Sequence, residues 1–151
     1  MQITGSQKIR APRQQVFQAL LNPEVLKNSI PGCESAALVD LPTGRQLKLT
    51  ISPNIPGLKG PYTVYVQTGE VVPASRVTLI TNPTSSMGSI QATCVIDLLE
   101  EGAETALNYN ANAIREGKIA AIPEMIIKGS VKSALDQFFK NFEKQVSTIP
   151  A

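Results

Sequence analysis

Hydrophobic and polar residues alternate through the middle of the chain, which is the pattern of β-strands with one buried and one solvated face. The alternation is clearest in five segments, 46–51, 62–67, 77–81, 90–98 and 107–113. Turn-forming residues separate the segments, and short turns of this kind join antiparallel neighbours. The middle of the chain is therefore predicted to be an antiparallel β-meander.

A strand and two short helices are predicted before this meander. A weaker alternation over 2–10 favours a strand that ends at Ala11-Pro12. Hydrophobic residues then recur at helical spacing over 16–21, and Asn22-Pro23 ends this helix and begins a second short one. The residues at 30–33, Ile-Pro-Gly-Cys, predict a turn.

Helical periodicity returns between Gly117 and Val146, but two parts of this segment differ. The later part has a single hydrophobic stripe, formed by Ile127, Val131, Ala134, Leu135, Phe138 and Phe142. The part from 119 to 127 is hydrophobic on both sides, so it needs a second neighbour besides the sheet. The candidates are the turn at 30–33, a bound apolar ligand, a partner subunit and a membrane surface. Pro123-Glu124 favours a long helix that begins there, with 117–122 as a separate turn.

Composition narrows the function. The chain has 151 residues, of which 42% are hydrophobic, and this length and content predict a single domain over 1–151. The 14 basic and 12 acidic residues are scattered, so we expect no nucleic-acid partner. Histidine is absent, which removes the commonest general base and the commonest metal ligand. We therefore expect no catalytic residue, no metal site and no cofactor.

The cysteines and the hydrophobic runs of the sequence indicate a cellular compartment. Cys33 and Cys94 have no CxxC spacing and are predicted to be small buried thiols. The N-terminus has no signal-like apolar segment, and no run of 18 apolar residues occurs. These features favour a cytoplasmic protein.

The order of strand, two short helices, meander and long C-terminal helix is the helix-grip plan of the START/SRPBCC superfamily. Three segments sharpen the resemblance: Ile3-Thr4-Gly5-Ser6 through Ala11-Pro12 with Val16-Phe17; Asn22-Pro23-Glu24-Val25-Leu26 through Ile30-Pro31-Gly32-Cys33-Glu34-Ser35; and Gly117-Lys118-Ile119-Ala120 with Gly129 and Phe138-Phe139. Together they resemble the CO dehydrogenase G-subunit family over essentially the whole chain.

This resemblance implies an α+β helix-grip fold, in which a curved antiparallel sheet of about seven strands is crossed by the long helix. It further implies a non-catalytic accessory protein that holds a lipophilic molecule, a quinone or a lipid, and helps couple a molybdenum hydroxylase such as CO dehydrogenase to the inner face of the cell membrane. The alternatives are a cyclase-like or hydrolase-like enzyme acting on an aromatic or polyketide substrate, and a structural subunit with a vestigial pocket.

The hydrophobic side of the meander and the early helical segment supply the candidate ligand-binding residues. They are Leu49, Ile51, Tyr62, Val64, Val66, Leu79, Ile90, Ala92, Cys94, Leu107, Tyr109, Ala111, Ile119, Ile122 and Ile126. For any single one of them a plain packed core is the simpler explanation, and the prediction of a pocket rests on the set. The Tyr62 and Tyr109 hydroxyls are candidates to bond a quinone oxygen. The candidate membrane contacts are Ile119, Ile122, Lys128 and Lys132.

Overall fold

A computed structural model of the chain describes residues 1–42, 44–52, 61–82, 84–85 and 88–147. Its sheet is antiparallel throughout and runs in the order β1-β8-β7-β5-β4-β3-β2, with the short β6 paired to β7. The strands are β1 Gln2–Ile9, β2 Cys33–Leu41, β3 Gly44–Ile51, β4 Tyr62–Val72, β5 Arg76–Thr81, β6 Thr84–Ser85, β7 Gly88–Glu101 and β8 Glu104–Glu116. The helices are α1 Arg13–Leu20, α2 Pro23–Ser29, the 3₁₀ helix η1 Gly117–Ala121 and α3 Glu124–Ser147. The helix-grip prediction is confirmed.

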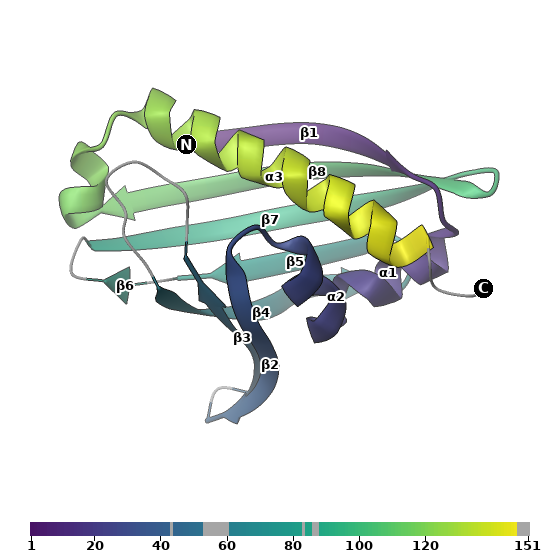
Figure 1. Cartoon of the computed structure of the whole chain (residues 1–151), viewed down its shortest axis with the longest axis horizontal. Coiled ribbons are helices and arrows are strands. Elements are labelled where there is room, and N and C mark those ends of the chain that lie inside the picture. The colour runs from purple at the N-terminus through teal and green to yellow at the C-terminus, as the bar shows by residue number, and fades with distance from the viewer. Residues whose placement is uncertain (43, 53–60, 83, 86–87, 148–151) are drawn as a thin grey trace.

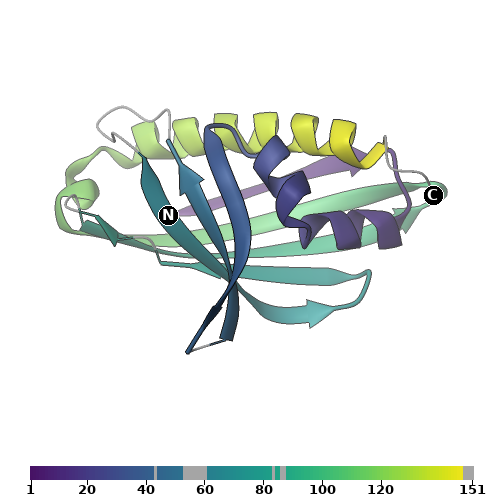
Figure 2. The same cartoon turned by 60° about the horizontal axis from the view of Figure 1, so that its bottom comes forward.

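The sheet curves around α3, and α1 and α2 close one end of the space between them (Figures 1 and 2). Strand β1 lies beside β8, so the first and last strands of the sequence are neighbours. The alternation in the sequence does not locate β2. This edge strand carries a bulge between Cys33 and Ser35, which shifts the register and disturbs a period of two.

The two short helices begin and end as their sequences indicate. The Asn22 side chain accepts hydrogen bonds from the backbone N–H of Glu24 at 2.9 Å and of Val25 at 3.4 Å. Pro23 follows this cap in the first helical turn, where its missing N–H costs nothing. The Asn22-Pro23 pair therefore both separates α1 from α2 and caps α2.

The C-terminal helical segment is divided as predicted, because η1 ends at Ala121 and α3 begins at Glu124. The Arg115 guanidinium donates a 2.7 Å hydrogen bond to the carbonyl oxygen of Ile122, between the two helices. Gly117 begins η1 with φ +85°, a conformation that glycine adopts readily. The division thus has local causes at each end of η1.

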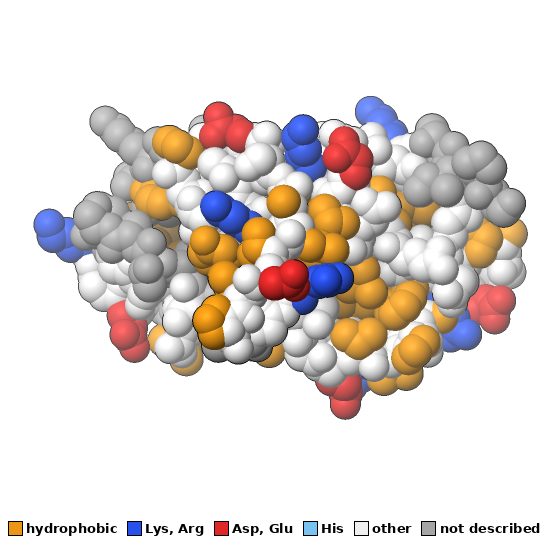
Figure 3. All heavy atoms as spheres, turned by 90° about the horizontal axis from the view of Figure 1, so that it is seen from below, with side chains coloured by type: hydrophobic (Ala, Val, Ile, Leu, Met, Phe, Trp, Pro, Cys, Tyr) orange, Lys and Arg blue, Asp and Glu red, His pale blue; other side chains and the backbone are white. Residues whose placement is uncertain are grey.

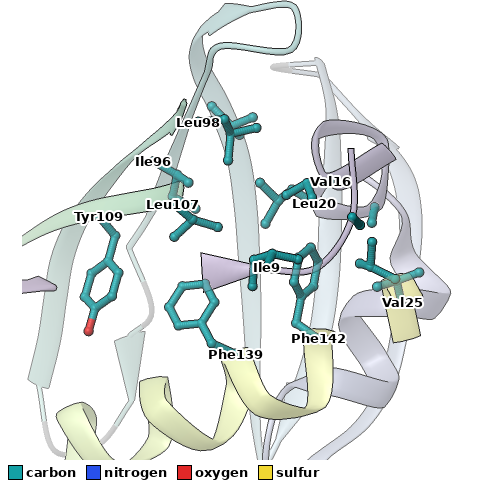
Figure 4. Close-up of a cluster of buried hydrophobic side chains, with 14 of the residues drawn as sticks. Ile9, Val16, Leu20, Val25, Ile96, Leu98, Leu107, Tyr109, Phe139 and Phe142 are labelled. Carbon is teal, nitrogen blue, oxygen red and sulfur yellow. The ribbon is translucent and has the colours of Figure 1, made fainter. Parts of the chain in front are cut away.

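The core lies between α1, the C-terminal half of α3 and strands β1, β7 and β8 (Figure 4). Its largest fully buried side chains are Phe142, Ile9, Leu20, Leu98, Leu107, Val16, Val77 and Val146. Two of the buried residues of α3, Phe139 and Val146, lie outside the predicted stripe, whereas Ala134 of that stripe is exposed. The stripe predicted for α3 therefore faces the core and the cavity, and Phe139 and Val146 extend it.

Polar contacts fasten the C-terminal half of α3 to its neighbours. Glu143 accepts hydrogen bonds from the backbone N–H of Arg10 at 3.1 Å and from the Arg10 guanidinium at 3.2 Å. Asn141 donates to the carbonyl oxygen of Ser29 at 3.2 Å, and Gln15 donates to that of Val146 at 2.9 Å. This half of the helix is thereby held against β1, α1 and α2.

Candidate functional site

A cavity of about 1110 Å³ lies between the concave face of the sheet and α3. Its wall is formed by Leu20, Leu21, Leu26, Ile30, Pro31, Gly32, Leu38, Arg45, Gln46, Leu47, Leu49, Ile51, Ser52, Val66, Thr68, Leu79, Thr81, Ala92, Cys94, Ile96, Gly129, Ser130, Val131, Ser133, Ala134, Leu135, Gln137, Phe138 and Phe139. Figure 3 shows the side of the molecule toward which the β2–β3 hairpin and α2 project in Figure 1. Groups of hydrophobic side chains lie on this face. Most of the wall is apolar, as in pockets that hold small hydrophobic molecules.

The strand register explains why the wall is apolar. Leu47 pairs with Val66, and Leu79 pairs with Cys94, so these residues share one face of the sheet. Their neighbours in sequence point to the opposite, convex face, where for example Thr93 is exposed. Because the alternation of hydrophobic and polar residues is in register across β3, β4, β5 and β7, their hydrophobic side chains form a continuous wall.

Six of the fifteen candidate ligand-binding residues lie in the cavity wall: Leu49, Ile51, Val66, Leu79, Ala92 and Cys94. Tyr62, Val64, Ile90, Leu107, Tyr109 and Ala111 share the inner face of the sheet but do not line the cavity. Leu107 and Tyr109 belong to the packed core, and Ala111 packs against it. Ile119, Ile122 and Ile126 lie at η1 and the start of α3, away from the wall. Which residues contact a ligand stays a prediction.

Several wall residues were absent from the sequence-based list. Leu20 and Leu26 come from α1 and α2, and Ile30 comes from the turn that follows. Helix α3 adds a second group, formed by Val131, Leu135, Phe138 and Phe139. The predicted hydrophobic stripe beyond Ile127 contains three of these four residues, so the helical periodicity indicated that they face inward. The periodicity does not indicate which residues of the stripe pack in the core and which line the cavity.

The Tyr109 hydroxyl is engaged within the fold rather than in the cavity wall. The side chain is 3% exposed, and its ring stacks on Phe139 with 5.2 Å between centroids (Figure 4). Its hydroxyl oxygen accepts a 2.7 Å hydrogen bond from Lys132 Nζ, which raises the pKa of Lys132. A side chain at Gly5 would collide with this hydroxyl, so glycine there makes room for the pair. The Tyr109–Lys132 contact joins β8 to α3.

Both cysteines are free thiols, and their surroundings differ. Cys94 lies in the cavity wall, and burial raises the pKa of its thiol to about 11. Cys33 is outside the wall and donates a 3.3 Å hydrogen bond to the carbonyl oxygen of Ser35. Burial also raises the pKa of Cys33. At neutral pH both groups are therefore uncharged.

The candidate membrane contacts differ in accessibility. Ile119 is only 4% exposed and Ile122 is half-buried, whereas Lys128 is exposed and Lys132 bonds to Tyr109. The exposed hydrophobic residues nearby are Met125 at 84% and Ile126 at 44%. Within the 119–127 segment, Ile119 and Ile127 are thus covered by the fold, whereas Met125 and Ile126 face outward. Within the described ranges, no helix combines the length and the hydropathy needed to cross a bilayer.

The wall offers little for acid-base or metal chemistry. Neither Asp nor Glu is among the described residues that line the cavity. Across the described part of the chain, no group of three or more potential metal-ligating His, Cys, Asp or Glu residues comes together. Besides the Cys94 thiol, the polar side-chain groups of the described wall are hydroxyls, amides and the Arg45 guanidinium, which can bind a polar group but do not form an acid-base pair.

Comparisons with solved structures place the fold. A conserved protein from Geobacillus kaustophilus is 27% identical with a TM-score of 0.86, and the match covers 97% of this chain and 95% of that one. A protein from Thermus thermophilus is 15% identical with a TM-score of 0.76, and the match covers 100% of each chain. A START superfamily protein from Mycobacterium smegmatis is 15% identical with a TM-score of 0.72, and the match covers 99% of each chain.

Sequence comparisons give one further result. No curated protein matches the chain. The family model for the G subunit of carbon monoxide dehydrogenase (CoxG) matches residues 5–147. This match includes all three helices, η1, every cavity-lining residue and nearly all of the sheet.

Proposed function

The chain belongs to the CoxG family, named for the G subunit of carbon monoxide dehydrogenase, and from that premise we propose that it binds a lipophilic small molecule in the cavity between the sheet and α3. The START-like fold supports the same proposal, since the sheet and the helix enclose a space instead of packing together along their whole length. The proposed role is non-catalytic binding.

The observation that carries the proposal is the size and lining of the cavity. Its volume of about 1110 Å³ lies just above the usual range for small-molecule sites, about 300–1000 Å³. Protein interiors are otherwise packed as densely as organic crystals. A space of this size beside a well-packed core at the other end of α3 is therefore better explained by an occupant than by poor packing.

A quinone or a lipid is the ligand that we propose. Each has a large apolar body that would contact side chains such as Ile96, Leu135 and Phe138. Because Tyr109 bonds to Lys132 and lies outside the wall, its hydroxyl is not the partner we propose for a quinone oxygen. Hydroxyl and amide groups of the wall, such as those of Ser130 and Gln137, take that role in the proposal.

We further propose that the chain serves a molybdenum hydroxylase such as CO dehydrogenase, by holding the ligand near the enzyme or the membrane. The family's description supports the link to CO dehydrogenase. Exposed Met125 and Ile126 beside Lys128 support peripheral contact with the inner face of the cell membrane. In this proposal the protein is cytoplasmic and reaches the membrane surface reversibly.

Native mass spectrometry of protein purified gently from cells tests the proposal. We expect a co-purifying isoprenoid quinone or lipid, and we expect delipidated protein to rebind a short-chain quinone. Ala92→Phe places a large ring in the cavity and should abolish rebinding. The matched control is Thr93→Phe, which puts the same ring on the exposed convex face. Absence of any bound or rebound lipophile, or equal loss in both variants, would contradict cavity binding.

A further inference from the structure

Strand β2 forms a free edge of the sheet. It is last in the strand order and pairs only with β3 among the described strands. Five of its nine residues are exposed, and neither Lys, Arg nor Pro occurs within Cys33–Leu41. Natural proteins use such residues to prevent edge strands from pairing with other chains. Apart from the bulge at its start, β2 therefore lacks the usual protection against pairing.

The surroundings of β2 leave room for a second strand. The outer part of the hairpin formed by β2 and β3 projects away from the helices (Figures 1 and 2). The opposite edge strand, β1, is different, because α3 lies beside it and Lys132 Nζ approaches Gly5. Strand β2 is thus the edge at which another chain can extend the sheet.

One hydrophobic side chain on this edge is left uncovered. Leu38 pairs with Leu47, and both line the cavity on the inner face of the sheet. Leu38 is nevertheless 51% exposed, because no described strand lies on its other side. Ala36 and Asp40 share this face, since each lies two residues from Leu38. A strand added at this edge would cover Leu38 and continue the inner face.

A second copy of β2 is a compatible partner in one antiparallel register. Opposite residues share a face of the sheet, so the two-fold axis lies at a residue and not between two. With the axis at Leu38, the two Leu38 side chains face each other, and Ala36 faces Asp40 of the other copy. An axis one residue earlier places Glu34 opposite Asp40, two like charges, and an axis one residue later places Leu38 opposite Asp40. Charge and hydrophobicity therefore favour the register centred on Leu38.

We infer that two copies of the chain pair through β2 to form one continuous antiparallel sheet, with a two-fold axis at Leu38. The inner face then carries a row of four leucines, which are Leu47 and Leu38 of one copy followed by Leu38 and Leu47 of the other. Each Leu38 is covered by its counterpart, so each copy completes the edge of the other's cavity wall. On the outer face, uncharged Ala37 and Val39 lie opposite each other.

Sedimentation analysis of the full chain over about 1–200 μM tests this pairing, and we expect a concentration-dependent equilibrium between monomer and dimer. Leu38→Lys places two like charges opposite each other and should raise the Kd of the dimer at least about tenfold. The matched control is Leu99→Lys, because Leu99 is 53% exposed on β7, away from this edge, and its Kd should be unchanged. Circular dichroism checks that both variants fold.

A change of charge at Ala36 tests the register. Ala36→Lys adds a cation opposite Asp40 of the other copy, twice in each dimer, and should lower the Kd by about two- to tenfold, the range of such exposed ion pairs. Ala36→Glu places like charges at the same two positions and should raise the Kd. Equal Kd values for the two variants would overturn the register.

A disulfide between copies tests the position of the axis. Residues directly opposite in an antiparallel pair have Cα atoms about 4.5–5.5 Å apart, which a disulfide can span. In a Cys33→Ser background, Leu38→Cys should therefore link two copies under mild oxidation. Ala37→Cys should not, because Ala37 faces Val39 of the other copy and not its own counterpart.

The outcomes separate this inference from the proposed function. A monomer at every concentration, or a dimer that Leu38→Lys leaves intact, would overturn pairing through β2. A link at Ala37→Cys in place of Leu38→Cys would overturn the axis at Leu38. Ligand binding stands in each of these cases, because the cavity belongs to a single copy. A dimer that Leu38→Lys dissociates and Leu38→Cys links supports the inference.

Discussion

The Cys94 thiol lies in the cavity wall, where its chemistry reports on the surroundings. Burial raises its pKa from 9.0 to about 11. Alkylating reagents react with the thiolate, so the reaction rate follows the deprotonated fraction. At about pH 8, that fraction is about 10⁻¹ for an ordinary thiol and about 10⁻³ for Cys94, a difference of about 100-fold.

Iodoacetamide labelling of a Cys33→Ser variant, followed by mass spectrometry, measures this rate for Cys94 alone. We expect the rate to rise about tenfold per pH unit and to level off near pH 11, with circular dichroism confirming that the fold persists. Limited access alone would lower the rate without moving the plateau. A plateau near pH 9 would therefore refute the argument that burial in the wall suppresses ionisation.

A ligand in the cavity should change this rate further. An occupant that covers the wall removes access to Cys94, so we expect labelling in wild-type protein to slow at Cys94 and to stay constant at Cys33, which lies outside the wall. Equal slowing at both residues would indicate a general change in the protein instead of occupancy. The same suppressed ionisation also keeps the thiol a poor nucleophile beside an electrophilic ligand such as a quinone.

Three further predictions concern the fold and the membrane. Phe142→Ala removes a fully buried ring and should lower the free energy of unfolding by about 3–5 kcal/mol in urea denaturation; a loss below about 1 kcal/mol would show that the core is less tightly packed than described. Gly88→Ala should lower the free energy of unfolding by more than the about 1–2 kcal/mol that a positive φ costs, because the new Cβ meets the Glu116 carbonyl. Gly102→Ala also has a positive φ but no close neighbour, so its loss of stability should be smaller. In liposome flotation, Met125→Asp should weaken binding to anionic vesicles and Leu99→Asp should not, and equal behaviour of the two variants would argue against contact through the start of α3.

Much of the fold could be predicted because its causes are local. The alternation over 90–98 depends on which side of a strand each residue occupies, and the structure places this segment in β7. Pro123-Glu124 likewise indicates the start of α3, since proline suits the beginning of a helix and interrupts its interior. The bulge in β2 is an exception, because an extra residue breaks the period that would locate the strand.

The candidate site was predicted less completely, and Tyr109 and Cys94 show why. Both lie on the inner face of the sheet, as the alternation indicates. Only the structure reveals that Phe139 of α3 packs on Tyr109, whereas Cys94 faces the cavity. The period of a strand identifies the face of a side chain but not the element that covers that face.

The amino-acid sequence by itself therefore determined the order of most elements, with β2 as the exception, the hydrophobic face of the sheet and the division of the C-terminal segment at Pro123, all of which depend on neighbours along the chain. The tertiary structure alone decided where α3 packs tightly and where it leaves a cavity. That choice depends on where α3 lies over the curved sheet, and contacts such as Glu143 with Arg10 and Lys132 with Tyr109 hold it there, between residues far apart in sequence.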